Sequence, residues 1–438
     1  MKTALVRQAR WGLGALAIGA ALAACGGGDG GSNTTSAGTG SGGSGSTGGS
    51  GNGGAVTPVT PAAVTYMGVV SFGDTVAITL DAPGAGKLKI RFADSAFGLS
   101  GTLIGDYALN AGVYTVSNLV VDSADPPPAF VSAVLSTITA TFTVSGTTLT
   151  GEIGGLPKQL GGGKLSGHVT ASSVSTAASA ASLAGTYTFL RTQSTYYASS
   201  GNLQTQAAMG GQMRVNADGT VRMCQTETYS DTCSAFPALL GTLALADQTR
   251  YPGAYQLTLG GKLWGRVFPL LDNGVPTLYL DHNTADTQGN PMTGTGVFHP
   301  GQSLTAGQFA GSWTCSEPGA AYAAVSGLGI RAALDGSIVT ETLTIDTNGV
   351  VTSAKHGTST PLLPNLTNNL LGIGYSAASM VPGTMTAIWT LPAPSTDTRT
   401  QVFLPVNANT MAYYAEIKST ASDPVPWTFV VQGTCRKG

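Results

Sequence analysis

The residues whose types could do chemistry in this 438-residue chain are its histidines, acidic residues and cysteines. Four histidines, His168, His282, His299 and His356, are scattered along the sequence, and none has the spacing of a zinc-binding motif. His282 and His299 fall in loop-like sequence, where they could form a metal-binding or catalytic pair. We expect instead that both are solvent-exposed loop residues.

The acidic residues form no obvious catalytic pair. Asp281, Asn283 and Asp286 could offer oxygen ligands to calcium, but the twelve-residue spacing of an EF-hand is absent, so we expect a polar turn. The folded part has no Gly-x-Ser-x-Gly nucleophile elbow. We therefore expect no enzyme activity, no catalytic residue, no metal and no cofactor.

The first 24 residues have the pattern of a secretory signal peptide. Lys2, Arg7 and Arg10 precede an uncharged, mainly apolar run that ends in small residues. That run is about 14 residues, or roughly 21 Å as a helix, which is too short for a bilayer core of about 30 Å. It predicts export rather than a membrane-spanning helix.

The tetrapeptide Leu22-Ala23-Ala24-Cys25 resembles the lipobox of bacterial lipoproteins. The resemblance implies that Cys25 carries the lipid and begins the mature protein, which is then held at the cell envelope by acyl chains. The residue after the cysteine is Gly26, which resembles the pattern of lipoproteins sent to the outer membrane. There the protein would face the periplasm or the cell surface. The alternative is an ordinary signal peptide with a bystander cysteine.

Five cysteines in an exported chain leave one unpaired unless one has another role. Lipidation of Cys25 would remove the odd one. Among the other four, Cys224 and Cys233 are near neighbours, whereas Cys315 and Cys435 bracket one long segment. We predict the pairs 224–233 and 315–435, with free buried thiols as the alternative.

Composition limits both the partners and the fold. Residues 25–56 are rich in Gly, Ser and Thr and predict a disordered tether with a reach of roughly 30 Å. Charged residues are only 10% of the chain and the net charge is −2, so no nucleic-acid partner is expected. Short alternating runs of Thr, Val, Ser and Tyr predict an all-β chain of antiparallel barrels or sandwiches.

The predicted β region divides into three parts. Residues 57–172 form an N-terminal β domain, residues 173–182 a linker, and residues 183–303 and 304–438 two further β domains. In the first, residues 138–153 alternate apolar residues with Thr around Ser145-Gly146, which predicts a hairpin. This pattern resembles the small barrels of surface lipoproteins related to transferrin-binding and complement-factor-H-binding proteins.

The last two β domains have matching motifs, which predict a duplication. Residues 183–188 (Leu-Ala-Gly-Thr-Tyr-Thr) match residues 309–314 (Phe-Ala-Gly-Ser-Trp-Thr). Residues 213–221 match 343–351, with Asp-Gly and Asn-Gly pairs at which two residues of positive φ are expected in a tight hairpin.

A second set of matches lies further along each copy. Arg266-Val267-Phe268 matches Gln401-Val402-Phe403, and residues 278–281 match 413–416. Each copy also opens with Gly-x-aromatic, which resembles the Gly-x-Trp opening of lipocalin-like barrels. That resemblance implies an aromatic side chain closing one end of a barrel core.

Aromatic residues are the remaining candidates for binding. Trp264, Tyr279, Tyr413 and Tyr414 could face a ligand, although core packing is the simpler expectation for any one of them. Because Tyr413 and Tyr414 are adjacent on a strand, we expect one of the two to line a surface or cavity. The other aromatic residues weighed with them are Tyr196, Tyr197, Trp389 and Trp427.

Together these patterns predict a lipoprotein of the bacterial outer membrane with a non-catalytic binding or envelope-structural role. Its partner would be an unknown protein or a small molecule. The alternative is a lipocalin-like carrier of a small apolar ligand, which requires an unfilled barrel interior.

Overall fold

The described strands form three antiparallel barrels, each built from one continuous part of the sequence, and one parallel strand contact, Lys164 opposite Asp335, joins the first barrel to the third. The computed structural model describes residues 62–81, 86–173, 178–233, 239–325, 329–367, 379–390, 398–418 and 428–438. The predicted signal peptide, Cys25, the predicted tether and Trp427 lie outside these residues. Among the described helices, none has the length and apolar character needed to cross a membrane.

Barrel 1 is a closed ring of eight strands in which each strand pairs with the next and β8 pairs back to β1. Two short helices, α1 (Ala129–Ser132) and η1 (Leu135–Thr137), lie between β5 and β6. Its strands are β1 (Val64–Val70), β2 (Asp74–Leu80), β3 (Lys87–Ser95), β4 (Gly101–Asn110), β5 (Val113–Val121), β6 (Thr139–Ser145), β7 (Thr148–Pro157) and β8 (Lys164–Ser172).

Barrel 2 repeats this plan, and β16 pairs back to β9. The 3-10 helix η2 (Ala180–Leu183) precedes its first strand. Its strands are β9 (Gly185–Tyr196), β10 (Leu203–Val215), β11 (Thr220–Gln225), β12 (Leu239–Leu245), β13 (Tyr255–Leu259), β14 (Lys262–Asp272), β15 (Val275–Ala285) and β16 (Pro291–Pro300).

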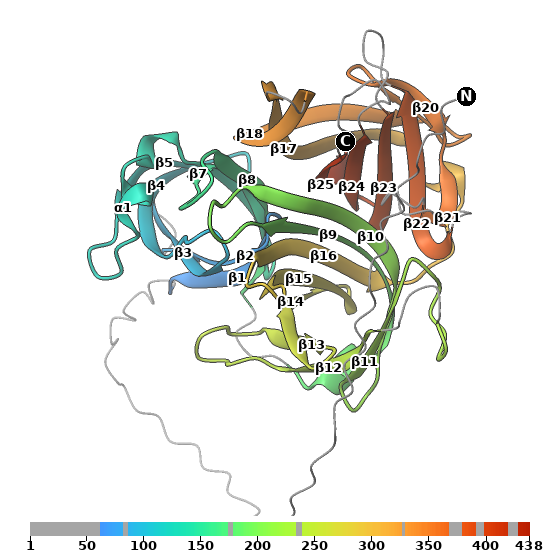
Figure 1. Ribbon diagram of the computed structural model, residues 1–438, viewed down its shortest axis with the longest axis horizontal. Coiled ribbons are helices and arrows are strands. Elements are labelled where there is room, and N and C mark those ends of the chain that lie inside the picture. The colour runs from blue at the N-terminus through green and yellow to red at the C-terminus, as the bar shows by residue number, and fades with distance from the viewer. Residues whose placement is uncertain are drawn as a thin grey trace, which may run out of the picture. The chain divides into compact units, whose positions relative to one another are not determined.

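In barrel 3, β25 pairs back to β17, and β20 and β21 follow each other between β19 and β22. The 3-10 helix η3 (Ala306–Phe309) precedes it. Its strands are β17 (Gly311–Val325), β18 (Gly329–Ile345), β19 (Val350–Ser353), β20 (Gly357–Pro361), β21 (Leu363–Thr367), β22 (Ser379–Thr390), β23 (Thr398–Asn407), β24 (Thr410–Lys418) and β25 (Thr428–Lys437). In Figure 1 the three barrels run from blue-green through yellow to red. The all-β, antiparallel prediction is confirmed.

The interior of each barrel is filled by the inward half of the alternating side chains. Phe142 is fully buried in the core of barrel 1 and Phe298 in that of barrel 2. Barrel 3 packs Trp313, Trp389 and Phe403 in the same way. Each ring therefore has its own hydrophobic core.

Many outward side chains are buried as well, because the barrels pack against one another. Between barrels 1 and 2, Met67 and Val69 lie in one cluster with Phe268. Between barrels 2 and 3, Leu190 lies in one cluster with Tyr414. The ion pair of Arg266 with Asp94 also joins barrels 1 and 2. Apolar outward faces thus hold the barrels together.

Barrels 2 and 3 begin with the same local arrangement. The Tyr187 hydroxyl donates a hydrogen bond to the carbonyl oxygen of Leu183 at 2.8 Å. Trp313 Nε1 donates to the carbonyl oxygen of Phe309, also at 2.8 Å and also four residues upstream. Both acceptors end a one-turn 3-10 helix. This shared arrangement supports a duplication, which stays a prediction.

The matching turns differ from the prediction in their backbone. Gly219 and Gly349 have φ of +82° and +80°, but Asp218 and Asn348 do not have positive φ. The expectation of two such residues per turn was wrong. Gly219 N donates to the carbonyl oxygen of Asn216, so this is a longer turn that needs a left-handed residue only at the glycine.

The predicted match between residues 266–268 and 401–403 is also displaced by one position. Tyr279 pairs with Phe268, but Tyr414 pairs with Val402. If Tyr279 and Tyr414 correspond, their pairing partners Phe268 and Val402 correspond as well. Phe403 then lies one residue further along its strand, and a shift of one residue moves a side chain to the opposite face. This explains why Phe268 points outward and Phe403 inward.

Both disulfides are present in the structure. Cys315 and Cys435 lie opposite each other on β17 and β25, 120 residues apart in sequence. Cys224 and Cys233 are 9 residues apart and span only the start of the β11–β12 connection. The first bond joins the first and last strands of barrel 3.

We predict that removing the two bonds has unequal effects. In the chain-entropy model the long loop is worth about 5 kcal/mol and the short loop about 3 kcal/mol. C315A/C435A should therefore lose about 2 kcal/mol more unfolding free energy than C224A/C233A in urea denaturation. Equal losses would show that loop closure does not determine their contributions.

Candidate functional site

A cleft of about 770 Å³ lies between the outward faces of the three barrels. Nearly half of its 33 lining residues are Ser or Thr, so its surface is rich in hydroxyl groups. These residues are Ser71, Thr141, Thr143, Ser145, Thr147, Thr148, Thr150, Thr170, Thr277, Thr295, Thr314, Ser316, Thr340, Thr410 and Thr434.

The β6–β7 hairpin of barrel 1 shows why these strands present hydroxyls. Phe142 and Leu149 are fully buried in the core of barrel 1. The intervening Thr141, Thr143 and Thr150 point to the other face and line the cleft. The alternation that predicted a hairpin therefore also produces one wall of the cleft.

Hydrogen bonds between barrels border the cleft. Asn407 Nδ2 of barrel 3 donates to Asp272 Oδ2 of barrel 2 at 2.8 Å. Thr295 Oγ1 of barrel 2 lies 3.2 Å from the Ser71 carbonyl oxygen of barrel 1. Arg436 of barrel 3 donates to Thr150 Oγ1 of barrel 1. These contacts connect the three walls.

The cleft carries few charges. Burial lowers the pKa of His168, although Glu152, whose Oε1 lies 3.7 Å from His168 Nδ1, acts in the opposite direction. Burial raises the pKa of Tyr279 to about 12, which keeps its hydroxyl protonated. Apart from Glu152, Asp272 and Arg436, the polar lining is neutral, so its polar groups can bind a ligand through hydrogen bonds beside apolar residues such as Leu271 and Val406.

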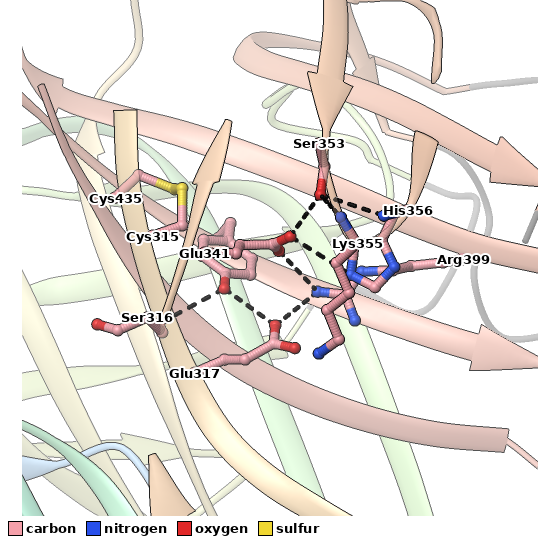
Figure 2. A network of polar contacts seen from close by, with 10 residues as sticks. Cys315, Ser316, Glu317, Glu341, Ser353, Lys355, His356, Arg399 and Cys435 are labelled. Atoms are coloured by element: carbon pink, nitrogen blue, oxygen red, sulfur yellow. Dashed lines mark hydrogen bonds and ion pairs between the residues drawn. A yellow bond between two sulfur atoms is a disulfide. The ribbon is translucent and has the colours of Figure 1, made fainter. Parts of the chain in front are cut away.

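A second polar cluster lies inside barrel 3 (Figure 2). Arg399, which is 1% exposed, donates to Glu317 Oε2 at 2.6 Å. The Tyr413 hydroxyl donates to the same oxygen at 2.9 Å. Glu341 Oε1 lies 4.0 Å from Arg399 Nη2, and its Oε2 accepts from Ser353 at 2.8 Å. The arginine is thus surrounded by carboxylates from two strands.

The charges in this cluster are balanced internally. Burial acts to raise the pKa of Glu317, but Arg399 and Tyr413 outweigh it, so this pKa lies below its usual value. Burial lowers the pKa of His356 to about 4, with Arg399 contributing, which leaves the imidazole neutral. Because its partners lie within the barrel, we assign this cluster to holding β17, β18, β23 and β24 together.

The predicted aromatic candidates are not brought together. Tyr279 lines the cleft, and Trp264 lies over the guanidinium of Arg191 inside barrel 2. Tyr413 lies inside barrel 3 and Tyr414 between barrels 2 and 3, each 1% exposed. The expectation that one of this pair lines a surface or cavity was wrong, because a neighbouring barrel covers the outer face. Ligand contact by Tyr279 or Trp264 stays a prediction.

The histidine expectation was also wrong. His282 and His299 lie on β15 and β16 and are 1% and 8% exposed. His299 Nδ1 is 2.9 Å from Thr277 Oγ1, whereas His282 packs edge-on against Trp264. His168 and His356 are buried too. His282 has the same parity as the core residues Leu278 and Leu280 and so points into barrel 2, whereas His299 follows the core residue Phe298 and points outward.

The proposed oxygen ligands for calcium do not converge. Asp281 is buried and accepts a hydrogen bond from Thr75 of barrel 1. Asp286 accepts from the backbone of Gln288 and Asn290, as a polar turn requires. Among the described residues, no three His, Cys, Asp or Glu side chains are grouped as a metal site.

Sequence reasoning missed the cleft and the buried arginines. The cleft joins strands that are more than 200 residues apart, and no local pattern encodes that meeting. For Arg191 and Arg399 a signal did exist. In a chain with 10% charged residues, each interrupts an alternating strand at an inward position.

Comparisons with known proteins add only distant likenesses. No protein-family model matches the sequence, and no curated protein matches it. One similar structure is a protein of unknown function from the DUF3598 family of Nostoc punctiforme, with 12% identity, 59% of this chain and 97% of that chain covered, and a TM-score of 0.21. Another is a tryptophan-to-alanine mutant of the vaccine antigen Transferrin Binding Protein B from Haemophilus parasuis, with 8% identity, 86% and 77% covered, and a TM-score of 0.22. At these scores neither likeness carries an inference about function.

The buried Asp281 carboxyl predicts a pH effect on stability. Burial raises its pKa to about 7, against about 4 in an unfolded chain. Its contribution to folding is therefore fully present below about pH 4 and is lost as the pH rises through 7. Asp281→Asn keeps an acceptor for Thr75 but cannot ionise, so its unfolding free energy should fall less between pH 4 and pH 8.

Urea denaturation across this pH range tests the prediction, with the exposed Asp231→Asn as the matched control. The native chain should lose up to about 4 kcal/mol relative to Asp281→Asn by pH 8. Burial, with a contribution from Arg191, lowers the pKa of His282 to about 3, below this pH range, so His282 stays neutral throughout the comparison. Parallel stability curves for the native chain and Asp281→Asn would contradict the prediction.

Proposed function

We propose that this protein is an outer-membrane lipoprotein, anchored through Cys25, with a non-catalytic role in which the cleft binds a polar ligand. The observation that carries the proposal is the hydroxyl-lined cleft between three barrels. A volume of about 770 Å³ is in the range of small-molecule sites. The hydrogen bonds that connect its walls hold the polar groups in place before a ligand arrives.

Hydroxyl groups both donate and accept hydrogen bonds, so the lining suits neutral, polar groups better than strongly charged ones. Tyr279 adds one aromatic face to this surface. The predicted alternative, a lipocalin-like carrier of an apolar ligand, needs space inside a barrel. The described barrel interiors are packed with large side chains such as Phe142, Phe298 and Trp389. This packing favours the cleft over a barrel interior as the place where a ligand binds.

We predict that filling the cleft removes its ligand. Thr314 is exposed and lines the cleft, so Thr314→Trp should occupy it without disturbing a core. Thr242 is an equally exposed strand residue outside the cleft, which makes Thr242→Trp a matched control. Native mass spectrometry of the purified proteins should show a bound species with the native chain and Thr242→Trp, but not with Thr314→Trp. A species retained by Thr314→Trp would place binding elsewhere.

The anchor has a separate test. Cys25→Ser removes the thiol that a diacylglyceryl group would modify, so the protein should move from the membrane fraction to the soluble fraction after cell lysis. Cys224→Ser should stay with the membrane. Membrane attachment of Cys25→Ser would refute the lipid anchor and leave the cleft proposal standing.

A further inference from the structure

Arg191 is a buried cation inside barrel 2. Its neighbours on β9, Tyr187 and Phe189, belong to the hydrophobic core, and Arg191 occupies the next inward position. It is 7% exposed. Burial lowers its pKa to about 10, which still leaves the guanidinium fully charged at neutral pH.

The groups around this guanidinium are neutral. Nη1 donates to Gln193 Oε1 at 3.0 Å, and Nη2 lies 3.5 Å from Gln225 Oε1 and 3.4 Å from Met209 Sδ. Nε has no hydrogen-bond partner within the described part of the chain. The Trp264 ring lies 4.7 Å from the guanidinium carbon, and His282 packs edge-on against that ring.

Among the described residues, the fully buried Arg399 and the half-buried Arg266 both have carboxylate partners. Arg399 pairs with Glu317 inside barrel 3, and Arg266 pairs with Asp94 between barrels 1 and 2. Glu317 lies four residues after Trp313 in barrel 3, and Arg191 lies four residues after Tyr187 in barrel 2. Glu317 and Arg191 therefore occupy corresponding inward positions. Among the described residues, no carboxylate forms an ion pair with Arg191.

Burying a charge without a counter-ion is unfavourable, and stacking on Trp264 offsets only part of that cost. An anion at the guanidinium would remove most of that cost. We propose that the end of barrel 2 bounded by Gln193, Gln225 and Trp264 is a binding site for a small oxyanion, held by Arg191. The site is separate from the cleft and does not depend on it.

The surroundings define which anions fit. Gln193, Gln225 and Trp264 are only partly buried, so they separate Arg191 from solvent without belonging to the filled core. The core below this layer is packed, so a ligand of Arg191 would have to lie among these three side chains, which favours a small anion over a long apolar chain. The amide groups of both glutamines can turn to donate to the anion, and the guanidinium offers paired N–H groups that match oxyanion geometry.

The test measures binding of inorganic phosphate, sulfate and acetate by isothermal titration calorimetry, with chloride maintaining constant ionic strength. We expect saturable binding of at least one oxyanion to the native protein. In Arg191→Gln its dissociation constant should rise at least tenfold. Arg214→Gln is the matched control, because Arg214 is an exposed arginine on the neighbouring strand β10 and should leave binding unchanged.

Two further measurements separate binding from folding. Circular dichroism and thermal unfolding in chloride check that Arg191→Gln is folded, and Arg191→Lys, which keeps the charge but not the paired donors, should bind with intermediate affinity. An anion beside Arg191 should also raise the pKa of His282 in the native protein, measured by NMR. Equal affinities of the native protein and Arg191→Gln, an unchanged His282 pKa at saturation, or no saturable binding of any probe would each overturn the proposal.

Discussion

A closed ring of strands turns alternate side chains inward and outward, and the structure depends on what covers the outward half. In this chain the outward Phe268, Leu190 and Tyr414 are buried by a neighbouring barrel. Burial of apolar area between barrels fixes which strands face one another. The cleft is the remaining part of those faces, where nearly half of the residues are Thr and Ser and the rest include apolar residues such as Leu271 and Val406. Barrel packing and the polar site are therefore two results of the same alternation.

Sparse charge makes each buried ion informative. Arg399 and Glu317 form an ion pair within barrel 3, and their network joins strands that are distant in sequence. Arg266 and Asp94 connect two barrels in the same way, with the Tyr251 ring 3.8 Å from the guanidinium carbon. Arg191 has the stacking partner but no described carboxylate. An ion pair within one barrel stabilises that barrel, and an ion pair between two barrels stabilises their packing. A buried cation without a carboxylate partner can instead attract an anionic ligand.

Local patterns were enough to predict the β class, the β6–β7 hairpin and both disulfide pairings. Period-two alternation, turn residues and cysteine spacing can each be read from the sequence without knowledge of how the barrels pack. They failed where burial comes from another barrel. Tyr414 looks exposed on an isolated strand, but residues of barrel 2 cover it. The one-residue displacement between the copies at Phe268 was missed for a different reason. A sequence match cannot report which face of a strand is inside. The cleft lay beyond prediction because it requires the packing of three barrels.

The disulfide between Cys315 and Cys435 has a consequence for cleavage by proteases. It joins the strands that open and close barrel 3, so all the loops of that barrel lie inside one covalent circle. A single cut in any of these loops opens the circle but leaves its two pieces attached, and the strand pairing around the ring can still hold them in register. The bond between Cys224 and Cys233 protects only one connection of barrel 2 in this way. Nicked barrel 3 thus remains one molecule until a reductant reaches the bond.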